Sequence, residues 1–405
     1  MNKLLQINVS ANTGSTGTIA EEIAKIAIAN GYDSYIAYGR SANESKSKLI
    51  KIETECGIRW HGLKSRLLDQ QGLASKGATK RLIKEIDTII QPDIIQIHNL
   101  HGYYIHYELL FEYLNKQDIL VVWTFHDCWP ITGHCSHFEF VACCKWQTEC
   151  NRCPNRKGYP RSLFMDNSKN NFYRKKELFS SCKNLTIVTP SVWLSNIVKQ
   201  SFLSDKNIVT INNGIDTTVF QPTSQQNIRG KYSIANDKFV ILGVANTWGK
   251  RKGYNDFLQL SEQLGDKEMI VLVGLNEQQK KGLPENIIGI SKTENTEELA
   301  QIYSMAEVFV NPTWVDNFPT TNIEALACGT PVVTYRTGGS PEAINTDTGW
   351  VVEKGNIVEL KKAIDTIREK GKSSFSEKCR QRAVELYSKE DRYNDYIQLY
   401  NSLLS

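Results

Sequence analysis

The sequence predicts an α/β protein built from two doubly wound, Rossmann-like domains that face each other across a cleft. The chain has 405 residues, which exceeds one ordinary core and suits two domains of about 200 residues each. In both halves, strand-length apolar runs alternate with helical patterns, as in a parallel sheet covered by helices. A polar, proline-bearing stretch, QPTSQQN, separates the two series, and we place the boundary near residues 213–224.

The first half opens with a strand–loop–helix–strand unit. KLLQINVS is typical of a buried strand, ANTGSTG of a glycine-containing loop, and TIAEEIAKIAIANG of a helix that stops at Gly31. DSYIAYG completes the unit as a second strand. Further strands are expected at Asp93–His98, Ile119–Thr124, Leu185–Thr189 and Ile208–Ile211.

The second half repeats the alternation without repeating the sequence. Strands are expected at Phe239–Ala245, Met269–Val273, Glu307–Asn311 and Pro331–Tyr335, and helices at Tyr254–Leu264, at Thr296–Ala306 and from near Thr320. The predicted domains are therefore 1–212 and 213–385, followed by a helical segment, 386–405, that crosses back onto the first domain. Ligands of such sheets bind outside the carboxyl ends of the strands, so the substrates are expected in the cleft.

Composition excludes several classes of protein. The net charge of +4 is small for this length, so nucleic acid is not an expected partner. The N-terminal segment lacks the regions of a signal peptide, and no apolar run reaches the roughly 18–20 residues of a membrane-spanning helix. These features favour a cytoplasmic protein.

The segment 316–344, DNFPTTNIEALACGTPVVTYRTGGSPEAI, carries the strongest functional signal. A helix that starts near Thr320 presents unpaired amides and a positive dipole end, which suits a diphosphate. Glu324 lies one turn further on, where its carboxylate can accept two hydrogen bonds from a ribose. The alternative is an ordinary loop and helix with two surface acids, Asp316 and Glu324. The donor-binding residues expected here are Asn317, Phe318, Pro319, Thr320, Thr321 and Glu324.

This segment resembles the signature of the family 4 retaining glycosyltransferases: two acids eight positions apart, then an alanine-rich Gly-Thr-Pro-Val turn. NNGIDTTVF at 212–220, RKG at 251–253 and TGWVV at 348–352 are also similar to the family. FHDCW and the cysteine-rich insert look most like bacterial transferases of capsular and exopolysaccharide synthesis, of the colanic-acid type. The resemblance implies a GT-B fold and transfer of a sugar, with retention, from a nucleoside diphosphate donor, without a catalytic metal.

The family pattern assigns roles to individual residues. The resemblance makes His126, Asp316 and Lys252 the catalytic candidates, with Asp316 in place of the family's glutamate. Lys252 matches the family's lysine that neutralises the diphosphate, whereas the family's Gly-Arg pair is replaced by VANTWGK, so Arg251 is a candidate substitute. Gly17 is expected to offer its amide to the phosphate from the other domain. The alternative for His126 is a structural histidine at a strand end.

Six of the ten cysteines fall between Cys128 and Cys153. In a reducing compartment such clustering favours metal over disulfides. A structural zinc is predicted in this insert, 128–153, with His134 or His137 as alternative ligands and plain thiols or disulfides as the other interpretations. The predicted ligands are Cys135, Cys143 (or Cys144), Cys150 and Cys153.

The function predicted is transfer of a sugar, with a UDP-sugar favoured over a GDP-sugar, to a hydroxyl of a lipid-linked saccharide in surface polysaccharide synthesis. A basic segment with interleaved apolar residues, 59–84, suits peripheral contact with the cytoplasmic face of the inner membrane, although a solvated helix is an equal alternative. Two other functions are a nucleotide-sugar 2-epimerase of the same architecture and a non-catalytic sugar-nucleotide-binding module.

Overall fold

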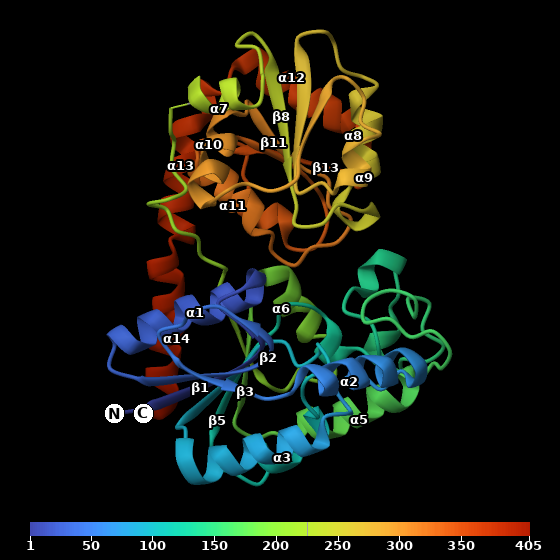
Figure 1. Cartoon of the computed structure of the whole chain (residues 1–405), viewed down its shortest axis with the longest axis vertical. Helices are drawn as coiled ribbons and strands as arrows, with labels where there is room; N and C mark the ends of the chain where they lie inside the picture. Colours follow the sequence, from blue (N-terminus) through green and yellow to red (C-terminus); the bar gives the residue numbers. More distant parts are fainter. Residues whose placement is uncertain (225) are drawn as a thin grey trace. The chain divides into compact units, whose positions relative to one another are not determined.

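The computed structural model describes residues 1–224 and 226–405. The chain divides into two compact units (Figure 1), one made of 1–212 together with 392–405 and the other of 213–391. The N-terminal unit therefore contains both ends of the chain. In the described part of the chain, no helix has the length and apolar character needed to cross a bilayer.

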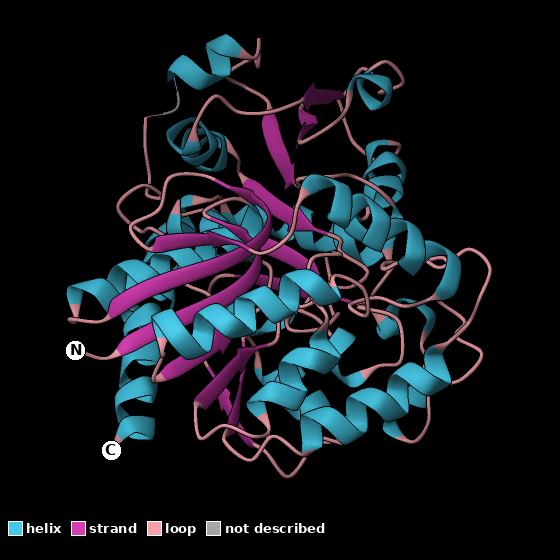
Figure 2. Ribbon diagram, turned by 60° about the horizontal axis from the view of Figure 1, so that its bottom comes forward, coloured by secondary structure: helices cyan, strands magenta, loops and turns pink. Residues whose placement is uncertain are grey.

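The N-terminal unit is built on a seven-stranded parallel sheet of order β3-β2-β1-β4-β5-β6-β7. Its strands are β1 (Lys3–Ala11), β2 (Asp33–Ala42), β3 (Lys48–Lys51), β4 (Ile94–Ile97), β5 (Leu120–Thr124), β6 (Leu185–Thr189) and β7 (Asn207–Thr210). Its helices are α1 (Gly14–Ala29), α2 (Glu55–Leu68), α3 (Lys76–Glu85), α4 (Tyr107–Leu114), α5 (Ser168–Ser180) and α6 (Val192–Val198). Figure 2 shows the strands running between layers of helices.

The C-terminal helix α14 (Lys389–Leu404) supplies part of the core of the N-terminal unit. In Figure 1 its red coil lies beside the blue elements of that unit. Tyr393, Tyr396 and Tyr400 are buried in one apolar cluster with side chains of β1, α1 and β5. The hydroxyl of Tyr400 also donates to Gln96 Oε1 at 2.7 Å, so a buried polar group of β4 is satisfied by the last helix.

The C-terminal unit has a six-stranded parallel sheet of order β10-β9-β8-β11-β12-β13. Its strands are β8 (Phe239–Val244), β9 (Glu268–Val273), β10 (Ile287–Ile290), β11 (Val308–Asn311), β12 (Val332–Tyr335) and β13 (Gly349–Val352). Its helices are α7 (Gln226–Lys231), α8 (Tyr254–Ser261), α9 (Glu277–Lys280), α10 (Thr296–Met305), α11 (Thr320–Ala327), α12 (Ile357–Lys370) and α13 (Ser373–Tyr387). Every pairing between neighbouring strands is parallel.

Both sheets confirm the predicted α/β class. The predicted strands end within one or two residues of the observed ones, except β2, which continues three residues beyond the prediction to Ala42. Three strands lack a prediction: β3, β10 and β13. β3 is an edge strand with exposed side chains, and β10 is a four-residue edge strand interrupted by Gly289. Short edge strands bury little apolar surface, so their sequences carry a weak periodic signal.

In each sheet the first strand of the unit has neighbours on both sides, and the strand order reverses between this strand and the later strand that pairs with it. The switch lies between β1 and β4 in one unit and between β8 and β11 in the other. Loops that leave the carboxyl ends of such strand pairs diverge and leave room for a ligand. Lys252 and Asp316 lie in the loops after β8 and β11, whereas His126 follows β5 and Gly17 lies in α1.

Candidate active site

Two predicted site residues of the C-terminal unit meet at its switch point. Lys252 lies in a short 3₁₀ turn, Lys250–Lys252, after β8, and Asp316 lies in the loop after β11. The Lys252 Nζ is 2.5 Å from Asp316 Oδ2, and both side chains keep about a fifth of their surface exposed, 21% and 18%. A partly exposed ion pair of this kind can exchange its partner for a bound anion.

Two glycines bring these loops together. Gly253 has φ +77°, and a Cβ there would lie 2.2 Å from the carbonyl oxygen of Pro312. Gly338 has φ +52°, and a Cβ there would lie 1.8 Å from the carbonyl oxygen of Asp316. Only glycine fits both the left-handed backbone and the close approach. The conformation of the acid-bearing loop therefore depends on glycines that precede and follow it.

Helix α11 begins directly after this loop. Pro319 is its N-cap residue, with extended backbone at φ −70°, and no side chain caps the helix. The first amides, those of Thr320 and Thr321, have no partner within the helix because of their position, and the helix dipole adds positive charge there. Asn317, Phe318 and Pro319 are buried immediately before it. This end of the helix suits an anion.

Glu324 faces the same region from the second turn of α11. Its Oε2 accepts the hydroxyl of Tyr303 at 2.8 Å. Burial raises the pKa of Glu324, while hydrogen bonds from Tyr303 and Thr320 and the charge of Lys252 oppose the rise. Lys252 therefore acts electrostatically on both predicted acids, pairing with Asp316 and attracting Glu324.

A buried network of hydrogen bonds connects the elements on either side of this loop, and no sequence motif indicated it. Asn322 donates to the carbonyl oxygen of Ser340 at 3.1 Å and accepts from Asn311 Nδ2 at 2.7 Å. Ser340 in turn exchanges a hydrogen bond with the hydroxyl of Thr334. The network ties β11, α11 and β12 together. Buried side-chain amides in two neighbouring elements are the only signal that could have indicated it.

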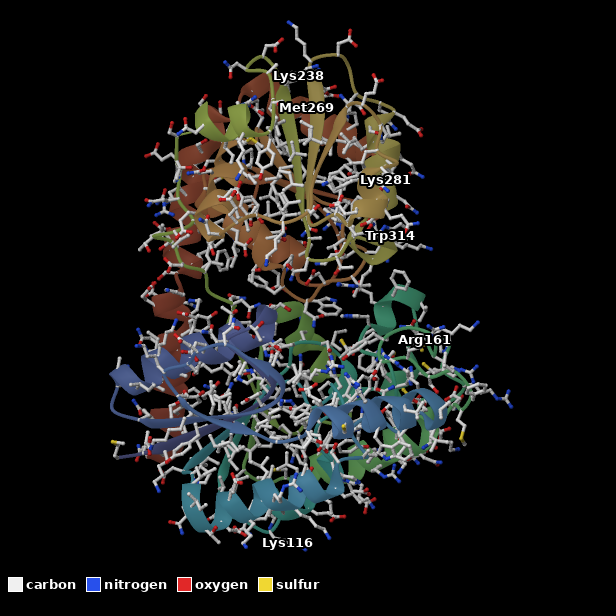
Figure 3. All side chains as sticks on the ribbon, in the orientation of Figure 1. Lys116, Arg161, Lys238, Met269, Lys281 and Trp314 are labelled. Atoms are coloured by element: carbon white, nitrogen blue, oxygen red, sulfur yellow. The ribbon has the colours of Figure 1, made fainter. Side chains whose placement is uncertain are left out.

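Arg251 lies next to Lys252 but points elsewhere. Its guanidinium donates to the carbonyl oxygen of Val315 at 3.2 Å, and its own carbonyl accepts from the amide of Trp314 at 2.8 Å. The indole of Trp314, labelled in Figure 3, is held by Asp256 at 3.0 Å. In this arrangement Arg251 stabilises the acid-bearing loop.

In the N-terminal unit, His126 follows β5 and contacts His98, which follows β4. His98 Nδ1 lies 3.0 Å from His126 Nε2, and His98 Nε2 lies 3.0 Å from Gln6 Oε1. Burial lowers the pKa of His126 to about 4 and that of His98 well below its usual value. Both rings are therefore neutral near pH 7, where each can donate only one ring hydrogen.

Gly17 is the fourth residue of α1. Its amide is the first one in α1 whose position allows a hydrogen bond to a carbonyl oxygen of the same helix. The free amides at this helix end are therefore expected to be those of 14–16. The missing side chain serves packing instead, since a Cβ on Gly17 would lie 2.8 Å from Ser10 Oγ. The phosphate role of Gly17 stays a prediction.

A second polar group near the strand ends had no sequence prediction. His101 Nε2 lies 2.7 Å from Asp127 Oδ2, and His101 Nδ1 lies 3.1 Å from the hydroxyl of Tyr159. Burial alone would raise the pKa of Asp127, but the charge and hydrogen bond of His101 hold it well below the usual range. The three residues come from segments far apart in the chain, so spacing alone could not indicate the group.

The predicted zinc ligands lie around one small cavity. Cys135, Cys143, Cys150 and Cys153 line it together with His134, whereas Cys144 is exposed elsewhere. His134 is fully buried: Asp69 holds its Nδ1, and its Nε2 has no hydrogen-bond partner among the described residues. Among all the residues that the structure describes, no three His, Cys, Asp or Glu side chains are grouped so as to hold a metal ion.

Two doubly wound parallel sheets, one in each unit, are the architecture of the GT-B class of glycosyltransferases. Residues 16–219, more than half of the chain, match the model of Glycosyltransferase Family 4, and residues 224–385 match that of glycosyl transferases group 1. The chain therefore belongs to the family 4 glycosyltransferases.

The chain is similar over its whole length to a protein of Escherichia coli (strain K12) named as a colanic acid biosynthesis glycosyl transferase, WcaC. The two are 23% identical over 425 residues, which cover 99% of this chain and 100% of that protein.

Solved structures share the fold. Sucrose-phosphate synthase from Thermosynechococcus elongatus has a TM-score of 0.73 at 17% identity and covers 100% of this chain and 99% of its own. Anabaena HepE in complex with UDP has a TM-score of 0.68 at 15% identity and covers 99% and 100%. These likenesses confirm the GT-B fold.

Proposed function

We propose that the protein transfers a sugar, with retention, from a nucleoside diphosphate donor to a hydroxyl of a lipid-linked saccharide during surface polysaccharide synthesis. The observation that carries the donor half is the pair Lys252–Asp316 beside the open N-terminus of α11. UDP is favoured as the nucleotide, which agrees with the UDP bound by a protein of the same fold. The colanic acid assignment of the full-length relative supports the polysaccharide context.

The chemistry follows from where charge develops. As the donor bond breaks, negative charge grows on the departing diphosphate and positive charge on the anomeric carbon. Lys252 and the amides of Thr320 and Thr321 stabilise the diphosphate, while Glu324 holds the ribose and Asp316 a sugar hydroxyl. In the front-face course that the family resemblance implies, the acceptor hydroxyl enters on the face that the diphosphate leaves, and the leaving phosphate takes its proton.

In this proposal the N-terminal unit binds the acceptor. His126, neutral near pH 7, lines the acceptor side without supplying charge. Its one ring hydrogen is donated to His98 Nδ1, because His98 donates its own to Gln6 Oε1. Peripheral contact with the cytoplasmic face of a membrane is supported by exposed apolar side chains on the predicted basic segment: Trp60 is 62% exposed and Leu63 47%. Both lie on α2 near Arg59 and Lys64, a composition that suits an anionic bilayer surface.

Product analysis with a radiolabelled nucleotide-sugar tests the proposal. Incubation with a lipid-linked saccharide fraction should release nucleoside diphosphate and move the label into the lipid phase with the anomeric configuration of the donor. An epimerised nucleotide-sugar would instead support the 2-epimerase alternative. Donor cleavage at background, with and without lipid acceptor, would support a binding module and overturn the transferase.

We also propose that the cysteine segment closes around a structural zinc. Support comes from the four thiols at one cavity and from His134, whose Asp69 partner resembles the carboxylates that orient metal-bound histidines. Binding must draw these side chains closer than they lie now. Cys153→Ser should lower the zinc content from about one ion per chain and lower the melting temperature, whereas Cys144→Ser, at an exposed position, should change neither. Wild-type protein without zinc, purified without chelators, would refute the proposal.

A further inference from the structure

A hollow of ≈ 540 Å³ in the N-terminal unit is lined by none of the predicted donor-binding residues. It is lined by Arg40, Arg66, Tyr103, Tyr159, Arg161 and Leu163. Its volume is in the range of small-molecule sites. Three of its six lining residues are arginines, and none is acidic.

The three guanidinium groups come from three separate segments. Arg40 is near the end of β2, Arg66 is in the last turn of α2, and Arg161, labelled in Figure 3, follows the cysteine segment. Among the described residues, none of the three forms an ion pair or a side-chain hydrogen bond with the protein. Like charges around one hollow repel each other, so the arrangement favours an anionic occupant. Arginine forks match phosphate oxygens in particular.

The hollow also has a defined hydrogen-bonding wall. Tyr159 is the outermost member of the group formed with His101 and Asp127. His101 Nδ1 fixes the hydroxyl of Tyr159 at 3.1 Å. A phenolic hydroxyl is both a donor and an acceptor, so the hydroxyl of Tyr159 can also form a hydrogen bond with a hydroxyl of the occupant. Tyr103, opposite, is held with φ +71° and packs against Arg40 at 5.3 Å.

The rim of the hollow continues into an exposed apolar strip. Leu163, Phe164 and Met165 are 40%, 72% and 51% exposed. The amide of Leu163 donates to the carbonyl oxygen of Arg66 at 2.7 Å, which fixes the strip beside the end of α2. A cationic hollow that opens onto an apolar strip suits a ligand whose anionic group is attached to an apolar chain.

We propose that this hollow binds the phosphate group of the lipid-linked acceptor, with the three arginines on the phosphate, Tyr159 on a sugar hydroxyl and the strip 163–165 along the lipid chain. The inference rests on the proposed transfer to a lipid-linked saccharide. It specifies a polyprenyl-phosphate type of acceptor over a neutral glycolipid or a free sugar.

Calorimetry tests the inference with three probes: farnesyl phosphate, farnesol and inorganic phosphate. The protein is first saturated with UDP, so that the donor site is occupied. Farnesyl phosphate should bind, farnesol should not, and inorganic phosphate should bind at least about tenfold more weakly. Arg66→Ala and Arg161→Ala should each weaken farnesyl phosphate by about tenfold or more, as expected for a lost charged hydrogen bond. Lys116→Ala, at an exposed position of the same unit outside the hollow, should leave the affinity unchanged.

Phe164→Ala distinguishes a lipid phosphate from free phosphate. It should weaken the binding of farnesyl phosphate and leave the binding of inorganic phosphate unchanged. Equal binding of farnesyl phosphate and farnesol, or wild-type affinity in Arg66→Ala and Arg161→Ala, overturns the inference. Equal binding of inorganic and farnesyl phosphate overturns the lipid assignment. The affinity of the same proteins for UDP is the independent readout. If the wild-type protein does not bind UDP, the proposed function is overturned. If it binds UDP but not farnesyl phosphate, only this inference is overturned.

Discussion

The two candidate sites of this protein are assembled in different ways. In the C-terminal unit, the donor-binding features come from one short stretch, 316–324, joined by Lys252 from the neighbouring strand end. In the N-terminal unit, the polar groups come from segments spread between Arg40 and Arg161. All seven histidines lie in this unit, between residues 61 and 137, and the C-terminal unit has none.

The difference teaches that a site can be recognised in a sequence when its residues are neighbours along the chain. A helix N-terminus and an acid one turn later require only local structure. A histidine–aspartate–tyrosine group requires the whole sheet to be folded. The charge chemistry differs as well, since a lysine–aspartate pair and a helix end dominate one site, whereas the other combines the neutral, buried imidazoles of His98 and His126 with three arginines. The following experiments act on these contrasts.

Removing the donor-site cation should have the largest effect. Lys252→Ala deletes the side chain that we propose neutralises the leaving diphosphate, and we expect kcat to fall by about 10²- to 10³-fold. Lys250→Ala, two residues away, is the matched control and should stay near the wild-type rate. Steady-state kinetics with the cognate donor measures both. Equal losses in the two variants would mean that general positive charge, and not the pair with Asp316, supports the reaction.

Acid should destabilise the N-terminal unit selectively. Burial lowers the pKa of His126 to about 4 and that of His61 to about 3, against 6.5 in the unfolded chain. The unfolded state therefore binds more protons below pH 6.5, so stability is fully present above that pH and falls as pH drops toward 4. The loss is roughly 3 kcal/mol per histidine. His134, whose pKa the hydrogen bond to Asp69 raises although burial opposes it, offsets part of it.

Pulse proteolysis with mass spectrometry at pH 7 and pH 5 can assign the loss to one unit. The C-terminal unit is the internal control because it has no histidine. Cleavage that appears first in the C-terminal unit on acidification would contradict the expected difference.

Removal of the expected ribose carboxylate should cost binding, not chemistry. Glu324→Ala should weaken the binding free energy of the donor by about 2 kcal/mol, which is the scale of a charged hydrogen bond. Calorimetry with the nucleoside diphosphate measures the change, with Glu353→Ala, an exposed acid paired to Arg336, as control. Unchanged affinity in Glu324→Ala would remove its ribose role, and the bond to Tyr303 would then be purely structural.

Steric disturbance of the loop junction should give the smallest of these effects. Gly253→Ala places a Cβ against Pro312 at a left-handed backbone position, so we expect a loss of about 1–2 kcal/mol in unfolding free energy. Gly249→Ala should stay within about 0.5 kcal/mol, because its backbone is extended and no atom lies within 4 Å of the new Cβ. Chemical denaturation of both variants decides whether the junction is as tight as the structure indicates.

Much of the fold was predictable because the central strands are continuous apolar runs. β1, β6 and β9 are buried almost throughout, so their sequences could not be mistaken for loops. Three of the four edge strands, β3, β10 and β13, had no prediction; each has only four residues and carries a weak periodic signal. The loop and helix start at 316–320 were predictable through a family resemblance and local helix physics together, and their role in donor binding stays a prediction. The network of Asn322 and the arginine hollow were not, since side chains from separate elements meet there without a fixed spacing.

The packing of α14 ties the order of synthesis to the order of folding. Tyr393, Tyr396, Ile397 and Tyr400 complete a core whose other buried members lie between residues 4 and 211. A ribosome therefore releases the strands of the N-terminal unit long before α14 emerges. Until then, the apolar face that α14 covers stays open to chaperones, and a nascent chain stalled before Tyr393 leaves it uncovered.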